Sequence, residues 1–241
     1  MIRFVFRARS ARGAALAACA AGTAAVQPPA PSAVSVDGYV TLRGADTVAV
    51  ERVTRDGAGG AVSELRLGGA SGAPAGLRLR TRTAAGADAA TTRVDAEVTP
   101  PGGSAPAQRV TIVFGPGDSA TVRAGDSPPQ RVPAARGAVA YTNLSVVSLE
   151  HILRRARVLA GAAGRAASVP VLVGGGAQAA VAFLSADSAT ITLGDVTLRV
   201  ARGPDDRVLG FTVPSQGVRA VRVPAARVPA ASVPGGGTGN R

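Results

Sequence analysis

Few residues of this 241-residue chain could carry out acid–base or nucleophilic chemistry near neutral pH. His151 is the only histidine, and Ser145, Ser148 and Glu150 lie close to it in the sequence. A serine hydrolase presents its nucleophile on a sharp Gly-x-Ser-x-Gly turn, and the sequence contains no such motif. We therefore expect no catalytic residues and no enzyme activity, with a hydrolase built on His151 as the less favoured alternative.

The sequence also contains few residues that could bind a metal ion or a phosphate-bearing cofactor. Zinc sites use His, Cys and acidic ligands in groups of about three or four, and the sequence has one histidine and one cysteine, Cys19. The glycine run 174–176 leads into a second strand pattern, without the Lys-Ser/Thr pair and the helix that a phosphate-binding loop needs. The sequence therefore predicts neither a metal site nor a cofactor.

Three aspartates, Asp46, Asp118 and Asp187, lie at the ends of short turns between strand patterns. An aspartate in this position can accept a hydrogen bond from its own backbone, and it tolerates unusual backbone angles. We interpret all three as turn formers rather than as catalytic carboxylates or calcium ligands. Such turns would place apolar residues opposite each other, as a half-buried sheet requires. The expected pairs are Val40 with Val50, Leu42 with Val48, Val181 with Ile191, and Phe183 with Ala189.

A row of arginines forms a conspicuous charge cluster. Arg78, Arg80 and Arg82 occupy alternate positions, so they share one face of a strand and, taken alone, suggest an anion-binding stripe. The next strand pattern carries Asp95 and Glu97 with the same period. We expect Arg80 to lie opposite Asp95 and Arg78 opposite Glu97. This arrangement favours a solvated cross-strand ion ladder over a ligand site.

These residues must be positioned by a sheet. Apolar and polar residues alternate from Ser35 to Val223, with turn residues about every eight to twelve positions, which is typical of antiparallel β-structure. One segment, at about 144–160, instead has helical periodicity, with an apolar stripe of Leu149, Ile152, Leu153, Ala156 and Leu159. We expect a mainly β fold, a curved antiparallel sheet or half-barrel built of hairpins, with this one amphipathic helix packed on its concave face. The side chains of His151, Arg154 and Arg155 should then point to solvent.

The first 25 residues have the order of a secretory signal peptide. An arginine-rich start is followed by a short apolar run and then by a stretch rich in Pro and Ala. The run Leu16–Cys19 resembles the lipobox of bacterial lipoproteins, which makes Cys19 the candidate lipidation site and a lipid chain the candidate membrane anchor. Cleavage at neighbouring small residues would instead release a soluble protein. The sequence thus predicts an exported protein, either periplasmic or attached to the outer membrane as a lipoprotein.

The sequence divides into a signal peptide at 1–25, a linker at 26–34, an antiparallel β domain at 35–223 and a tail at 224–241. The tail has low complexity and ends in a glycine-rich run, so we expect it to be disordered. All 27 basic residues are arginines, and the formal net charge is +12. A basic surface attracts polyanions, but the aromatic residues that could stack on bases are few and scattered. We therefore expect no nucleic-acid partner.

Several patterns resemble an uncharacterised group of exported β-rich bacterial proteins. They are the run Ala45–Glu51 followed by Thr54 and Arg55, the two Asp-Ser-Ala turns, and the entry into the helix at Tyr141. In outline this group is similar to periplasmic half-barrels of the lipoprotein-carrier type, in which a curved antiparallel sheet wraps a helix. The resemblance implies a curved sheet around a helix, and carriers of this type hold lipid chains in an aromatic-rich hollow.

The favoured function is that of a non-enzymatic binding or carrier module of the cell envelope for an apolar or lipid-like ligand. The residues expected to line its pocket are Phe114, Phe183, Phe211, Ile152 and Leu153. The alternative is a structural or assembly module of the envelope that binds no small molecule. An apolar cavity of several hundred Å³ between helix and sheet would favour the binding module.

Overall fold

The computed structural model describes residues 34–228, apart from residues 58, 70–74, 104, 162 and 174. The expected signal peptide at 1–25, with Cys19 in it, lies outside the described residues. All of the expected linker except Val34, and residues 229–241 of the expected tail, also lie outside them.

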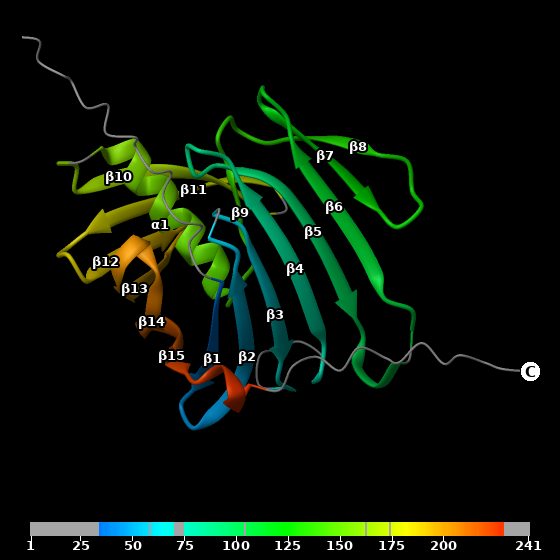
Figure 1. The fold of residues 1–241 in the computed structure, drawn as a ribbon, viewed down its shortest axis with the longest axis horizontal. Helices are drawn as coiled ribbons and strands as arrows, with labels where there is room; N and C mark the ends of the chain where they lie inside the picture. The colour runs from blue at the N-terminus through cyan, green and yellow to red at the C-terminus, as the bar shows by residue number, and fades with distance from the viewer. Residues whose placement is uncertain are drawn as a thin grey trace, which may run out of the picture. The chain divides into compact units, whose positions relative to one another are not determined.

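The described chain folds into one sheet of fifteen strands and one α-helix (Figure 1). From β1 at the middle of the sheet, consecutive strands extend to one side and form the first wing. The first wing comprises β1 (Ser35–Arg43), β2 (Asp46–Arg55), β3 (Ala61–Leu67), β4 (Arg78–Ala85), β5 (Thr91–Thr99), β6 (Gln108–Phe114), β7 (Ser119–Ala124) and β8 (Gln130–Pro133).

The second wing begins with the last strand, which pairs with the other side of β1. It comprises β15 (Val218–Val223), β14 (Val208–Val213), β13 (Val196–Arg202), β12 (Ser188–Leu193), β11 (Gly175–Phe183), β10 (Ala166–Val173) and β9 (Val139–Ala140). The helix α1 (Val146–Ala160) connects β9 to β10. Because a helical crossover returns the chain to the same edge, these two strands pair in parallel.

The expected fold class is confirmed. The sheet is curved and open, it carries one helix, and its remaining neighbouring strands pair antiparallel. The single parallel pair makes it a mixed sheet, a detail that the alternation of residues does not reveal. The helix begins at Val146, within two residues of the expected start.

The two wings meet at β9. The backbone N–H of Thr91, at the start of β5, donates to the carbonyl of Ala138, and the N–H of Ala140 donates to the Thr91 hydroxyl. On the same side, Arg155 of α1 donates to Asp88 in the β4–β5 turn. These contacts hold the curved sheet around the helix without a continuous ladder of strand pairing between β5 and β9.

Most of the expected hairpin pairs are confirmed. Val40 lies opposite Val50, Val181 opposite Ile191, and Phe183 opposite Ala189. The pairing of Leu42 with Val48 is wrong, because the register shifts between Thr41 and Leu42, and Leu42 lies opposite Thr47 instead. A bulge of this kind adds a residue to one strand and increases its twist.

The arginine row keeps the expected face but not the expected partners. Arg80 lies opposite Glu97 and Arg82 opposite Asp95, two residues away from the expected register, because the hairpin turn is centred later and contains a register shift at its base. The ion pair of Arg80 is made with Glu64 of β3, at 3.7 Å. The row is therefore part of a charged, solvated sheet face, as expected. The expected ladder of ion pairs with Asp95 and Glu97 is wrong, because Asp95 pairs with Arg93 and Glu97 with Arg109.

The core lies between α1 and one face of the sheet, here called the inner face; the opposite face is called the outer face. From the helix, Leu149, Ile152, Leu153 and Ala156 are at most 2% exposed, as expected for the apolar stripe. Leu159 is 45% exposed, so its expected burial is wrong. The helix contacts β9, β10, β11, β14 and β2, and this contact on several sides buries residues beyond the stripe.

The C-terminal tail begins with ordered residues. Residues 225–227 form a 3-10 turn, and Val228 is 3% exposed. A Cβ atom placed on Gly38 of β1 would lie 2.8 Å from the Val228 side chain. Only glycine allows this approach, so the tail expected to be disordered from Pro224 packs against the sheet as far as Val228.

Candidate functional site

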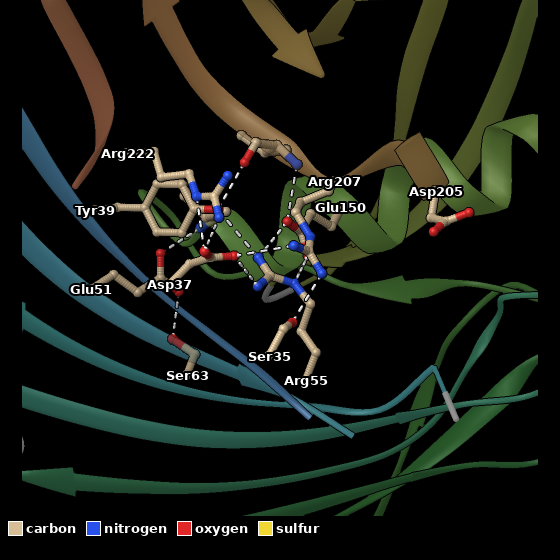
Figure 2. Close-up of polar contacts among 12 residues, drawn as sticks. Ser35, Asp37, Tyr39, Glu51, Arg55, Ser63, Glu150, Asp205, Arg207 and Arg222 are labelled. Carbon is tan, nitrogen blue, oxygen red and sulfur yellow. Dashed lines mark hydrogen bonds and ion pairs between the residues drawn. The ribbon is translucent and has the colours of Figure 1, made fainter. Parts of the chain in front are cut away.

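A charge cluster lies beneath the helix, on the inner face of β1 and β2 (Figure 2). Its members are Asp37, Tyr39, Arg55, Glu150, Arg154, Arg207 and Arg222. Asp37, Tyr39 and Arg55 occupy odd-numbered positions of neighbouring strands, so the pleat of the sheet turns all three toward α1. The helix contributes Glu150, which is 1% exposed.

Arg55 lies at the centre of this cluster and is 5% exposed. Its Nε and Nη2 atoms donate to the two carboxylate oxygens of Glu150, at 2.8 and 2.7 Å. Its Nη1 donates to Asp37 at 2.6 Å, and Nη2 also donates to the Tyr39 hydroxyl at 3.2 Å. This fork-to-fork geometry is the strongest form of an ion pair between arginine and a carboxylate. Although burial disfavours the charged guanidinium, the hydrogen bonds and charge of Glu150 raise the pKa of Arg55 above its usual value.

The cluster also ties β14 to the helix. The Tyr39 hydroxyl donates to the carbonyl of Val208 at 2.7 Å, and the N–H of Val208 donates to Glu150 at 3.0 Å. Burial, and next the charge of Glu150, raise the pKa of Tyr39, so its hydroxyl stays protonated and can donate. Buried charges are stable only when they are paired and hydrogen-bonded, and these contacts satisfy that requirement.

Glu51 is a second buried carboxylate, and it caps the helix. It accepts hydrogen bonds from the hydroxyls of Ser63 and Ser145 and from the backbone N–H of Val146, the first residue of α1. A carboxylate is favourable at a helix N-terminus because it meets unpaired N–H groups and the positive end of the dipole. Burial raises the pKa of Glu51, while these three donors oppose that rise.

His151 has a different environment from the one we expected. It is 2% exposed, and its Nε2 atom has no hydrogen-bond partner among the described residues. Burial, and next the charge of Arg154, lower the pKa of His151 to about 4, so the ring is neutral at pH 7. The expected solvent exposure is wrong because strands of the sheet, β2 among them, and neighbouring turns pack around the helix. Arg154 and Arg155 are also half-buried, with side chains 24% and 12% exposed.

The residues considered for a hydrolase site around His151 do not form a catalytic arrangement. The Ser145 hydroxyl donates to Glu51, and the Ser148 hydroxyl accepts from the N–H of Thr142. Within the described part of the chain, no hydrogen bond joins His151 to either serine or to Glu150. Among the same residues, no three His, Cys, Asp or Glu side chains are grouped closely enough to hold a metal ion.

An apolar cavity of about 440 Å³ lies between the start of α1 and the second wing. It is lined by Tyr141, Asn143, Leu144, Leu149, Val173, Gly176, Ala177, Leu193, Gly194, Val196, Leu198, Phe211, Val213 and Gln216. Leu193 and Val196 lie opposite each other and share the inner face, and Ala177 shares that face with its partner Val171. Small side chains at the strand ends, such as Ala177, leave this space unfilled beyond the start of the helix.

Only Phe211 of the expected lining residues borders the apolar cavity. Ile152, Leu153 and Phe183 lie in the packed core instead, and the Arg157 guanidinium stacks on the Phe183 ring at 3.7 Å. Phe114 lies on β6 in the first wing, away from α1. The middle of the apolar stripe, where we expected the pocket, is closely packed. The cavity lies instead at the start of the helix.

A second, polar cavity of about 370 Å³ lies beside the charge cluster. It is lined by Ser35, Arg55, Gly57, Gly59, Gly60, Arg154, Asp205 and Arg207. The glycines belong to the β2–β3 loop, and Asp205 and Arg207 belong to the connection between β13 and β14. No local sequence pattern predicts this site, because its residues come from four separate segments of the chain.

No family model matches the chain, and no curated protein matches it. Its fold is shared with the crystal structure of a protein from Pseudomonas aeruginosa, with a TM-score of 0.54. That structure is of a DUF1089 family protein. The likeness covers 71% of this chain and 91% of the DUF1089 chain at 17% sequence identity. At this identity the likeness concerns the fold alone. The described part of the chain has no helix long and apolar enough to cross a membrane.

Proposed function

We propose that this protein is a non-enzymatic binding module of the cell envelope that takes up an apolar or lipid-like ligand in the apolar cavity. The observation that carries this proposal is the cavity itself, about 440 Å³ in volume and lined mainly by apolar side chains of α1 and the second wing. Ligand pockets in proteins have volumes of about 300–1,000 Å³ and a similar mainly apolar lining. A purely structural module would have no need to keep such a space open.

The polar groups around the cavity suit a ligand with one polar end. They are the Tyr141 hydroxyl and the side-chain amides of Asn143 and Gln216. Burial raises the pKa of Tyr141, which keeps its hydroxyl protonated, and this hydroxyl donates to the Asn143 Oδ1 atom at 3.4 Å. The Asn143 Oδ1 atom accepts from the N–H of Leu144 at 3.0 Å, so the orientation of this amide is held in place.

The lining supports binding rather than catalysis. Tyr141 is the one titratable residue on it, and general acid–base catalysis needs groups whose pKa values lie near the working pH. The likeness to lipoprotein-carrier half-barrels belongs to the same proposal, in which the curved sheet holds a lipid-like chain. The location in the cell envelope is also part of this proposal. It is supported by the order of residues in the leader and by Cys19 within a lipobox-like run.

The test uses two phenylalanine substitutions at neighbouring positions of β11. Ala177 borders the cavity, whereas Gln178 is exposed on the outer face. Ala177→Phe should fill part of the cavity and weaken binding of dansyl-undecanoic acid at least about 10-fold, and Gln178→Phe should leave it unchanged. Binding is measured by titration of directly excited dansyl fluorescence, with circular dichroism of both variants to confirm the fold.

Two results would contradict the proposal: the absence of saturable binding by the wild-type protein, or equal weakening by the two substitutions. Native mass spectrometry of the protein purified from its own envelope would identify a ligand directly. A co-purified lipid that is lost in Ala177→Phe supports the binding module. A ligand-free mass together with no dansyl-probe binding supports the structural alternative.

A further inference from the structure

We propose that the polar cavity binds a phosphate group, carried either by inorganic phosphate or by a phosphomonoester lipid headgroup. This site is separate from the apolar cavity, since the two share no lining residue. The proposal therefore does not depend on the proposed function.

The charge cluster contains more guanidinium groups than carboxylates in its ion pairs. Four guanidinium groups, of Arg55, Arg154, Arg207 and Arg222, face two carboxylates, Asp37 and Glu150. The carboxylates are already engaged at close range by Arg55 and Arg222. Arg154 and Arg207 reach them only at 3.7 and 3.9 Å. Two positive charges are thus left without a close partner, and a dianionic phosphate would balance them.

Arg154 and Arg207 point donors toward the polar cavity. Both line the cavity, and their side chains are only 24% and 34% exposed, so water solvates them incompletely. The Nε of Arg154 donates to the carbonyl of Asp205 at 3.3 Å, and Nη2 of Arg207 donates to the Ser35 hydroxyl at 2.9 Å. These bonds fix both guanidinium groups, while both Nη atoms of Arg154 and Nη1 of Arg207 make no hydrogen bond within the described chain. Fixed and unsatisfied guanidinium donors are suited to phosphate oxygens.

Glycines of the β2–β3 loop form one wall of the polar cavity. Gly57 and Gly59 have φ angles of 74° and 92°, which favour glycine, and a Cβ atom on Gly59 would meet nothing within 4 Å. A Cβ atom on Gly60 would lie 2.3 Å from the Asp56 carboxylate, which accepts a hydrogen bond from the Gly60 N–H. At Gly57, Gly59 and Gly60, backbone rather than a side chain therefore borders the cavity. A phosphate can approach such a wall closely.

The connection that carries Arg207 is held in an unusual conformation. Asp205 and Asp206 both have left-handed backbones, with φ of 58° and 55°, and Asp206 is anchored by an ion pair to Arg202 at 2.8 Å. Non-glycine residues held in this region often lie at binding sites. In Figure 2 the Asp205 carboxylate points away from Arg207 and Glu150. Among the described residues, the ion pairs of Arg154 and Arg207 are made with Glu150 and Asp37 and not with Asp205.

A phosphate fits these donors better than a carboxylate does. The two guanidinium groups come from different elements, α1 and the β13–β14 connection. A tetrahedral phosphate offers separate oxygens to each of them, whereas a planar carboxylate has only two oxygens for both. The two uncompensated positive charges also match a phosphomonoester, which carries a charge of about −1.5 to −2 near pH 7.

The experiment compares Arg154→Gln and Arg207→Gln with Arg82→Gln. Both cavity variants retain the buried pair between Arg55 and Glu150, and Arg82 is an exposed arginine outside the cavity with no ion pair among the described residues. Binding of sodium phosphate is measured by isothermal titration calorimetry at constant ionic strength, and circular dichroism verifies each fold. We expect saturable binding to the wild-type protein, weakened at least about 10-fold in each cavity variant and unchanged in Arg82→Gln.

Co-sedimentation with vesicles identifies the source of the phosphate. Phosphatidylcholine vesicles are compared with vesicles that also contain phosphatidic acid. Binding to the phosphatidic acid vesicles that is lost in Arg154→Gln identifies a headgroup, whereas calorimetric binding alone identifies free phosphate. The proposal is overturned if neither probe binds saturably, or if Arg82→Gln weakens binding as much as the cavity variants do. Either failure leaves the dansyl-probe test of the apolar cavity unaffected.

Discussion

Acid should destabilise this protein through His151. The pKa of this buried ring is lowered to about 4, from 6.5 in an unfolded chain. Between these values the unfolded state binds a proton that the folded state does not, so folding loses stability as the pH falls. The free energy of unfolding has its full value, as far as His151 is concerned, above pH 6.5. It decreases as the pH falls from 6.5 toward 4. One pKa unit corresponds to about 1.4 kcal/mol, so the loss is about 3 kcal/mol.

His151→Leu isolates this effect. The Nε2 atom has no hydrogen-bond partner among the described residues, so an apolar side chain of similar size breaks no hydrogen bond there. We expect the variant to be about as stable as the wild-type protein at pH 7. Its free energy of unfolding, measured by urea denaturation, should fall by about 3 kcal/mol less than that of the wild-type protein between pH 7 and pH 4.

A matched control distinguishes burial from the mere presence of a histidine. Leu159 lies on the same helix and is 45% exposed. Adding Leu159→His to His151→Leu restores an imidazole in solvent, where its pKa should be similar in the folded and unfolded states, so the lost pH dependence should not return. The carboxyl groups of the protein titrate in all three proteins and cancel in the comparison. Equal loss of stability in the wild-type protein and His151→Leu would refute the reasoning.

Two further predictions concern the charge cluster and the leader. Glu150→Gln removes the charge that balances Arg55, and we expect it to lower the free energy of unfolding by about 3–5 kcal/mol, as does breaking other buried ion pairs; a loss below 1 kcal/mol in urea denaturation would contradict this. The lipoprotein alternative predicts that Cys19→Ser moves the protein from the membrane to the soluble fraction of the envelope and abolishes a lipid mass on the mature N-terminus. An unchanged distribution would favour ordinary signal-peptide cleavage.

The alternation of residues was enough to predict the sheet. In β2 and β3 alternate residues are buried, as the period-two pattern requires, and the pairing of Val181 with Ile191 follows from turn length and apolar matching alone. Helical periodicity likewise located α1. These features are local, because strand and helix periods and turn residues act over a few positions.

The errors in register also have local causes that the pattern does not reveal. A bulge after Thr41 shifted Leu42 to Thr47, and a later turn centre moved the partner of Arg80 to Glu97. In the arginine row the shift is two residues, which keeps every side chain on the same face, so the alternating pattern is equally well satisfied in either register. The face was therefore predictable, whereas the partner was not.

The candidate sites were decided by the tertiary structure. Arg55 and Glu150 are 95 residues apart in the sequence, and they meet only because α1 lies across β1 and β2. The polarity of His151 indicated a solvated helix face, but contact with several strands buried it. The apolar cavity exists because the second wing extends beyond the start of the helix, where no side chain fills the space. Periodicity states which face of an element is apolar, and only the packing of distant elements determines which buried charges meet and where a cavity remains.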